Sequence, residues 1–125
     1  AINIRSNQKK ILRLGNIKVI RDWGWAEEYV EAMQSILRSN NLRNYLICTG
    51  EPNSLELFVK KVFHRLGLDY KEHVQFDKAI SRKFDIEISY GDPSPLKKDL
   101  GWEAKKKFDD VIELLLENEL KNQKY

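Results

Sequence analysis

The fold of this 125-residue chain depends on one stretch, Arg21-Asp22-Trp23-Gly24-Trp25-Ala26-Glu27-Glu28-Tyr29-Val30-Glu31-Ala32-Met33. Its first five residues combine a cation, an acid, two indoles and a glycine, and Gly24 allows the backbone to turn sharply. From Ala26 onward the apolar residues follow the i, i+3, i+4, i+7 spacing of an amphipathic helix, namely Ala26, Tyr29, Val30, Met33, Ile36 and Leu37. We therefore expect a strand that carries Arg21, a tight turn, and a helix over 26–38.

Arg21 is the first candidate binding residue, because an arginine held at such a corner can meet an anionic ligand. Its planar guanidinium matches the oxygens of a phosphate group in a bidentate arrangement. The simpler interpretation is a surface ion pair between Arg21 and Asp22 beside a tryptophan core, and spacing alone favours it. The residues by themselves leave both interpretations open.

The composition is that of a folded protein rather than a disordered tail. Apolar residues make up 42% of the chain and charged residues 33%, and the length suffices for one domain with a modest core. No apolar run is long enough for a membrane span, and no signal segment opens the chain. The single cysteine, Cys48, lies in the apolar run 45–48, where we expect a small buried side chain in a reducing cytoplasm.

The net charge of +3 gives little support to nucleic-acid binding. The clustered lysines form three pairs, at 9–10, 60–61 and 97–98, and one triplet at 105–107, each with carboxylates nearby. They form no long basic block and no array of aromatic and basic residues. His64 and His73 have no second ligand at metal spacing, so we expect no metal site. A generic nucleic-acid binder is a minor alternative.

The remaining sequence alternates apolar runs with breakers, which predicts a mixed α/β domain. The expected strands lie near 11–20 (a hairpin that turns at Gly15-Asn16), 44–48, 72–76 and 86–89. The other expected helices lie near 54–66, 93–100 and 104–120. Asn53 and Glu56 can cap the helix near 54–66 as in a capping box, and Gly67 and Gly101 can end helices. The apolar stripes of the three long helices should supply the core.

Three segments resemble one family of nucleotide-sugar enzymes. Leu14-Gly15-Asn16-Ile17, followed by Arg-Asp-Trp-Gly-Trp-Ala-x-x-Tyr-Val-Glu-Ala-Met at 21–33, resembles the C-terminal part of the GDP-mannose 4,6-dehydratase family. That family belongs to the extended short-chain dehydrogenase/reductase superfamily, whose enzymes have a Rossmann-type NAD(P)-binding domain. The order of strand, Thr49-Gly50-Glu51, loop and helix is similar to its corresponding segment, and 91–102 resembles a signature of many nucleotide-sugar epimerases and dehydratases.

The resemblance implies two binding residues besides Arg21. The family carries Arg-Pro-x-Glu/Asp before an apolar strand, and Arg82 and Asp85 match the first and fourth positions, with Lys83 in place of the proline. In the family these positions face the GDP, so Arg21 and Arg82 are expected to meet the diphosphate and Asp85 the ribose hydroxyls. Without the resemblance, Arg82 would be interpreted as one more solvated base.

The resemblance covers nearly the whole chain but only about the last third of a typical family member. A dinucleotide-binding turn needs closely spaced glycines, and those at 15, 24, 50, 67, 91 and 101 are far apart. No tyrosine is followed four residues later by lysine, the proton-donor pair of the superfamily. We therefore expect no catalytic, cofactor-binding or metal-binding residue in 1–125, and interpret the chain as a fragment that lacks the N-terminal dinucleotide-binding domain.

By resemblance, the whole enzyme is an NADP-dependent lyase of GDP-fucose biosynthesis that converts GDP-mannose to GDP-4-keto-6-deoxy-mannose with loss of water. This piece is expected to hold the GDP moiety and to be inactive alone, without bound NADP. The implied partners are GDP-mannose and the remainder of the enzyme, which is expected to be a homo-oligomer, with no nucleic acid and no membrane. The alternative is a free-standing, non-catalytic nucleotide-sugar binding or interaction module derived from the family.

Overall fold

A computed structural model describes residues 1–40, 43–82 and 84–122 as a mixed α/β chain, which confirms the expected fold class. The helices are α1 (Ile2–Arg5), α2 (Ala26–Arg38), α3 (Leu55–Arg65), α4 (Tyr70–His73), the 3-10 helix η1 (Lys78–Ile80), α5 (Ser94–Leu100) and α6 (Phe108–Asn122). The strands are β1 (Leu12–Leu14), β2 (Ile20–Asp22), β3 (Pro52–Ser54), β4 (Val74–Phe76) and β5 (Ile88–Ser89). None of the helices in the described part of the chain is long and apolar enough to cross a membrane.

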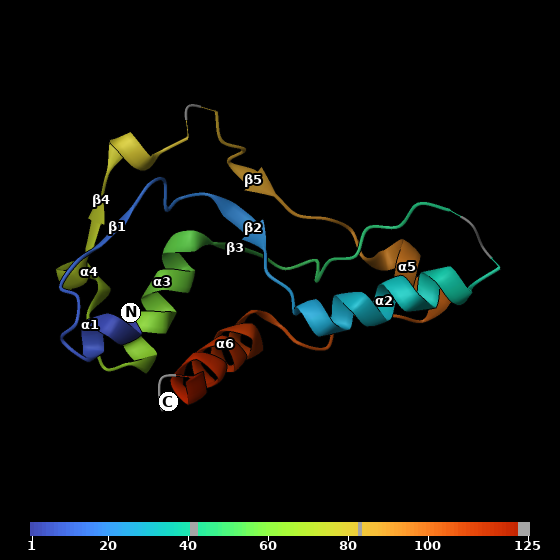
Figure 1. Cartoon of the computed structure of the whole chain (residues 1–125). Helices are drawn as coiled ribbons and strands as arrows, with labels where there is room; N and C mark the ends of the chain where they lie inside the picture. The colour runs from blue at the N-terminus through green and yellow to red at the C-terminus, as the bar shows by residue number, and fades with distance from the viewer. Residues whose placement is uncertain (41–42, 83, 123–125) are drawn as a thin grey trace.

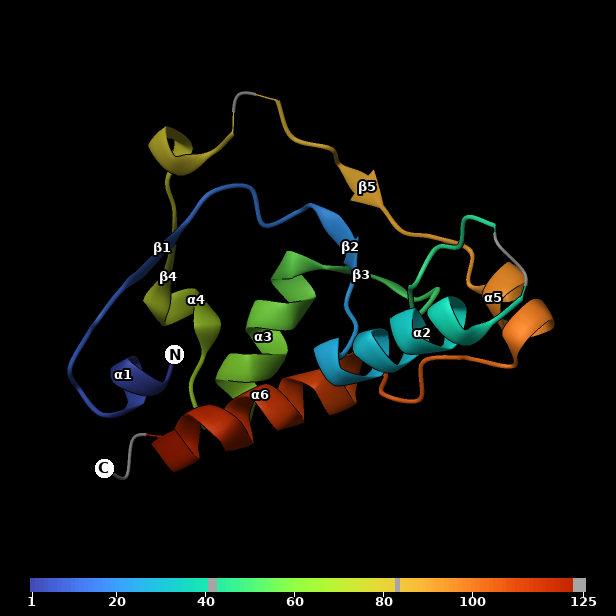
Figure 2. The same ribbon diagram turned by 45° about the vertical axis from the view of Figure 1, so that its right-hand side comes forward.

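The elements form two ends joined by β2. Figure 1 shows α1, α3, α4 and α6 gathered at one end, and α2 beside α5 at the other. The turned view in Figure 2 keeps the same grouping, with β2 leading from the first end into α2. The stretch that begins at Arg21 therefore connects the two ends of the molecule.

The helix α2 begins directly after the turn, as its spacing predicts. Gly24 is required there because a Cβ atom at this position would overlap the ring of Tyr29, which lies against it. Glu27 and Glu28 occupy the first helical turn, where negative charge is favoured by the helix dipole. At the other end the Ser39 hydroxyl donates to the carbonyl oxygen of Ile36 at 2.9 Å.

The expected hairpin between β1 and β2 is wrong. β1 pairs in parallel with β4, whereas β2 is the middle strand of a sheet in the order β3-β2-β5. The link between β1 and β2 bonds to the start of α3 instead: Leu55 N donates to Val19 O at 2.9 Å and Glu56 N to Ile17 O at 2.8 Å. These bonds use backbone acceptors that a hairpin would have needed.

Two other strand predictions are also corrected. Residues 43–50 form no strand, and the neighbouring strand β3 has the polar sequence Pro-Asn-Ser, which carries little β-signal. The first half of the predicted strand 72–76 is the helix α4, because the Asp69 carboxylate accepts from Lys71 N at 3.0 Å and caps that helix. Only 74–76 remain as a strand.

The core lies between α1, α3 and α6. Two apolar clusters fill it, one of Ile2, Leu66, Phe108, Ile112 and Leu116, and one of Ile4, Val59 and Phe63. Trp23 joins the first cluster by stacking on Phe58, with ring centroids 4.6 Å apart. The stripes of α3 and α6 therefore supply the core as expected.

The stripe of α2 was expected in the core as well, and that prediction is wrong for four of its six residues. Ala26 is exposed, Val30 is 50% exposed, Met33 51% and Leu37 83%, whereas Ala32, which was not in the predicted stripe, is fully buried. The side of α2 that packs is set by Tyr29, whose ring meets Trp102 edge-on with centroids 6.3 Å apart. Packing through Tyr29 turns the exposed residues of the stripe away from the protein.

Helix ends follow the sequence in part. Gly67 and Gly101 adopt the left-handed conformation, with φ of 73° and 69°, at the ends of α3 and α5 as expected. The cap of α3 is Ser54 rather than Asn53, since the Ser54 hydroxyl accepts from Leu57 N at 3.1 Å. Glu56 accepts from the Tyr70 hydroxyl at 2.9 Å and so does not complete a capping box.

Candidate functional site

The three residues predicted to bind the ligand line one pocket. Arg21 comes from β2, Arg82 from the segment after η1, and Asp85 from the segment before β5. They face a cavity of about 260 Å³ whose other lining residues are Gly15, Asn16, Val19, Leu55, Ile80 and Ser81. The fold thus brings together residues that are more than sixty positions apart in the sequence.

Strand pairing places Asp85 near Arg21. β2 and β5 pair in parallel with Ile20 opposite Ile88, and Ile20 N donates to Glu87 O at 2.7 Å. The segment that enters β5 therefore runs beside the residue before Arg21. Asp85, two residues ahead of Glu87, reaches the guanidinium from there.

A close approach of two backbones forms the other wall of the pocket. A Cβ atom on Gly15 would lie 3.1 Å from Ser81 Cα and 3.2 Å from Ile80 O, which is tighter than ordinary packing. The nearby Asp77 N donates to Leu14 O at 2.8 Å and holds η1 against this turn. Gly15 thereby sets how near the segment that carries Arg82 comes to β2.

Arg21 is fixed by an ion pair with Asp85, not with Asp22. Its Nη2 donates to Asp85 Oδ1 at 2.9 Å, and the two side chains are only 28% and 22% exposed. Its Nη1 donates to Ile20 O at 2.7 Å and to Glu87 O at 3.4 Å. A guanidinium has five N–H donors, so donors are left over for a ligand while the pair is intact.

Arg82 presents its charge at the edge of the pocket. It is exposed, and within residues 1–40, 43–82 and 84–122 it makes no hydrogen bond or ion pair. The lining carries two guanidinium groups and one carboxylate, a net charge of +1 that suits an anion. Lys83, which stands in place of the family's proline, lies outside the described residues.

Asp22 has a structural function that the sequence did not reveal. Its Oδ1 accepts from Thr49 N at 2.9 Å and Thr49 Oγ1 at 2.8 Å, and its Oδ2 accepts from Gly50 N at 2.8 Å. These bonds tie the end of the apolar run 45–48 to β2 without sheet pairing. The available signal was the joint occurrence of Asp-Trp-Gly and Thr-Gly-Glu, which spacing alone does not connect.

The hydroxyl of Tyr29 and the thiol of Cys48 lie near this carboxylate. Burial, with the Asp22 carboxylate beside it, raises the pKa of Tyr29 to about 12. The pKa of the Cys48 thiol is also raised, first by burial and second by the negative charge of Asp22. Cys48 is 7% exposed, so it is buried as expected, and its raised pKa disfavours the reactive thiolate.

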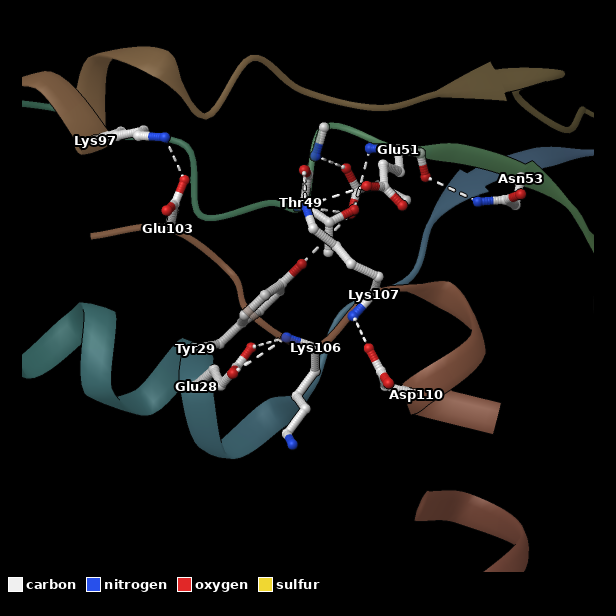
Figure 3. Close-up of polar contacts among 12 residues, drawn as sticks. Glu28, Tyr29, Thr49, Glu51, Asn53, Lys97, Glu103, Lys106, Lys107 and Asp110 are labelled. Carbon is white, nitrogen blue, oxygen red and sulfur yellow. Dashed lines mark hydrogen bonds and ion pairs between the residues drawn. The ribbon is translucent and has the colours of Figure 1, made fainter. Parts of the chain in front are cut away.

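A polar network fastens the link between α5 and α6 to the rest of the protein (Figure 3). Lys106 N donates to both carboxylate oxygens of Glu28 on α2, at 3.0 and 3.2 Å. Lys107 pairs with Glu51 at 3.2 Å, and Lys97 pairs with Glu103 at 2.5 Å. Part of the lysine triplet 105–107 is therefore used within the fold.

Solved structures of nucleotide-sugar enzymes share this fold. A dTDP-glucose 4,6-dehydratase from Bacillus anthracis, in complex with NAD, superposes with a TM-score of 0.85 at 17% identity, over 99% of this chain and 39% of that one. A UDP-glucose 4-epimerase from Thermotoga maritima, with UDP-glucose, gives 0.76 at 19% identity, over 97% of this chain and 38% of that one. The chain therefore has the fold of part of a Rossmann-type extended short-chain dehydrogenase/reductase.

Sequence comparison assigns the chain more narrowly. The model of the GDP-mannose 4,6 dehydratase family matches residues 1–115. GDP-mannose 4,6 dehydratase 1 of Arabidopsis thaliana is 36% identical over 109 residues, 87% of this chain and 30% of that protein. The human GDP-mannose 4,6 dehydratase is 30% identical over 84% of this chain and 33% of that protein. The chain belongs to the GDP-mannose 4,6 dehydratase family, and it spans about a third of the length of these relatives.

Proposed function

We propose that this chain is the substrate-holding portion of a GDP-mannose 4,6-dehydratase and binds the GDP moiety in the pocket of Arg21, Arg82 and Asp85. The supporting observation is that one cavity is lined by all three residues, although two of them lie far from Arg21 in the sequence. A nucleoside diphosphate presents two anionic phosphates and a ribose diol. Two arginines and a carboxylate match these groups in number and charge.

In the proposed complex, Arg21 keeps its bonds to the protein and turns its remaining N–H donors to the diphosphate. Asp85 holds the guanidinium in place from one side, and its second carboxylate oxygen faces the ribose hydroxyls. Arg82 supplies the second cation from the exposed edge. Such fixed positioning of the nucleotide keeps the sugar in one place for the reaction.

The nicotinamide cofactor is assigned to the rest of the enzyme. A phosphate-binding turn needs an open glycine between a strand and a helix. In the described chain, two links from a strand to a helix contain a glycine, at Gly24 and Gly91, and their Cβ positions are covered by Tyr29 and by the Cys48 sulfur. These residues do not fit a dinucleotide, so we place NADP and the chemistry of water loss in the portion this chain lacks.

The test is a comparison of two cationic residues of one segment in the complete enzyme. Arg82→Ala should raise the KM for GDP-mannose about ten- to a hundredfold, since a charge-assisted hydrogen bond contributes roughly 1.5–3 kcal/mol. Lys78→Ala removes an exposed cation of η1 that does not line the pocket, and it should leave KM unchanged. Equal effects of the two substitutions would show that general positive charge, not this pocket, binds the substrate.

A further inference from the structure

Asn16 lines the pocket of Arg21 and Arg82, and its amide group has no part in the function described so far. The residue was expected in a two-residue hairpin turn, but β1 and β2 do not pair, and its φ is not positive. It is half-buried and follows Gly15, where a Cβ atom would press on the backbone of Ser81. Asn16 therefore lies beside the segment that carries Arg82.

The carboxamide of Asn16 has a fixed orientation. Its Oδ1 accepts from Lys18 N at 2.9 Å, and only the oxygen end of the group can accept from a backbone N–H. The next residue is held as well, because Glu56 N donates to Ile17 O at 2.8 Å. The turn therefore uses the oxygen of Asn16 and leaves the nitrogen, Nδ2, free. An aspartate would serve the turn equally well.

Nδ2 of Asn16 is an unused donor that solvent can reach. Within residues 1–40, 43–82 and 84–122 it has no hydrogen-bond partner. No buried side-chain nitrogen or oxygen in these ranges lacks a partner, and Asn16 is only half-buried, so Nδ2 is accessible. Among the described lining residues, Ser81 has the other neutral polar side chain, and its hydroxyl donates to Asp77 O at 3.5 Å. Asn16 thus supplies a neutral donor that is available to a ligand.

We propose that Nδ2 of Asn16 donates a hydrogen bond to a phosphate oxygen of the nucleotide and joins Arg21 and Arg82 in holding the diphosphate. This inference rests on the proposed function, because it takes the pocket to bind the GDP moiety. A diphosphate has several oxygens that only accept, whereas Arg21 already donates to Asp85 and to Ile20 O. An amide N–H forms a charge-assisted bond with such an oxygen.

The phosphate oxygens fit Asn16 better than the ribose hydroxyls do. A phosphate oxygen can use only a donor, which is what Nδ2 supplies, whereas a hydroxyl can pair with a donor or an acceptor. Asn16 also lies beside the segment of Arg82, a cation assigned to the diphosphate. The carboxylate assigned to the hydroxyls, that of Asp85, is paired with Arg21.

The experiment replaces Asn16 in the complete enzyme and separates the turn from the donor. Asn16→Ala removes the donor without adding charge, and it should raise the KM for GDP-mannose and the inhibition constant of GDP about tenfold. Asn16→Asp keeps an oxygen for Lys18 N and should raise both values further, because its carboxylate repels a phosphate. In both variants kcat and the melting temperature should change little, since the bond to Lys18 N is exposed.

Lys18→Gln is the matched control for charge. It lowers the net charge by the same amount as Asn16→Asp and lies in the same link, but Lys18 does not line the pocket. Its bond to Asn16 uses the backbone, so the substitution leaves the turn intact. The KM should stay within about twofold of the unmodified enzyme. A rise equal to that of Asn16→Asp would show that general charge weakens binding, and it would overturn the proposal.

Guanosine, which has no phosphates, identifies the group that Asn16 contacts. Its inhibition constant should be the same for the unmodified enzyme and for both variants of Asn16. Weaker guanosine binding by Asn16→Ala, or normal GDP binding by Asn16→Asp, would assign Asn16 to the ribose or the base and overturn the proposal. A normal KM for Asn16→Ala beside a raised KM for Arg82→Ala would overturn this inference alone. A normal KM for both would overturn the proposed function as well.

Discussion

At the scale of single residues, neighbouring acidic and basic side chains have separate functions. Asp22 does not pair with Arg21 but accepts three hydrogen bonds from Thr49 and Gly50. Arg21 pairs instead with Asp85, which brings a third segment to the pocket. The alternation of side-chain direction along β2 separates the two charges, because successive residues of a strand point to opposite faces.

Asp22→Ala should therefore destabilise the fold rather than the ligand site. It removes the acceptor of the Thr49 and Gly50 backbone N–H groups and of the Thr49 and Tyr29 hydroxyls, which are partly buried, and unpaired groups of this kind cost about 1–3 kcal/mol each. Urea unfolding should show that the free energy of unfolding falls by about 2–4 kcal/mol, less than the sum of the separate costs because the groups share one acceptor. Asp77→Ala, which removes only the exposed bond to Ala79 N, should cost at most about 1 kcal/mol.

The hydroxyl of Tyr29 should make stability depend on pH in the alkaline range. Its pKa is raised by burial and by Asp22 from 10 to about 12 in the folded protein, so the unfolded chain releases the proton first. The stabilisation is complete below pH 10 and is lost as the pH rises through about 12. Between these values the free energy of unfolding should fall less steeply for Tyr29→Phe than for the unmodified chain, measured by chemical denaturation. Parallel curves for the two proteins would contradict this.

At the scale of elements, α3 is the helix on which both core clusters and the pocket depend. It contributes Val59 and Phe63 to the core, and its first residue, Leu55, lines the pocket. Its start is fixed by bonds from Leu55 N and Glu56 N to the link before β2. The N-terminus of α3 thus couples the core to the site.

The cap of α3 should be detectable by substitution of two adjacent residues. Ser54→Ala removes the acceptor of Leu57 N and should cost about 1 kcal/mol of stability. Asn53→Ala removes only an exposed side-chain bond from Asn53 to Glu51 O and should cost less than half of that. Thermal unfolding of the two variants compares them, and a larger cost for Asn53→Ala would favour the cap that spacing predicted.

At the scale of the whole molecule, the described part of the chain has an apolar core and a candidate ligand pocket, and the chain spans about a third of the length of its curated relatives. The core lies at the end that contains α3 and α6, and the candidate pocket lies beside it. The exposed apolar residues Val30, Met33 and Leu37 lie on α2. The polar network around Glu28 and Lys106 keeps α2 attached to the link before α6.

The chain alone should be catalytically silent. Incubation with GDP-mannose and NADP should yield no keto-sugar above background, because the sequence contains no tyrosine–lysine pair and no open glycine turn. Chromatography of the nucleotide sugars measures this directly. Turnover that persists after rigorous purification would show that the chemistry lies in this chain.

The sequence by itself determined the features that depend on near neighbours. The bounds of α2, the approximate bounds of α3 and α5, and the ends at Gly67 and Gly101 all follow from periodicity and backbone freedom over a few residues. Of the candidate binding residues, Arg21 was singled out by its place at a strand-to-turn corner and by the resemblance, and Arg82 and Asp85 by the resemblance alone; all three line one cavity. Whether they bind GDP stays a prediction.

Only the tertiary structure decided which segments pair. β1 joins β4 rather than β2, Ser54 rather than Asn53 caps α3, and most of the predicted apolar stripe of α2 is exposed. In each case two groups of the chain could satisfy the same backbone donor, carboxylate or packing face. The sequence around each group makes both equally suitable, so it does not decide between them. The winner depends on segments many residues away, such as Asp85 beside Arg21 or Trp102 beside Tyr29, which local spacing does not encode.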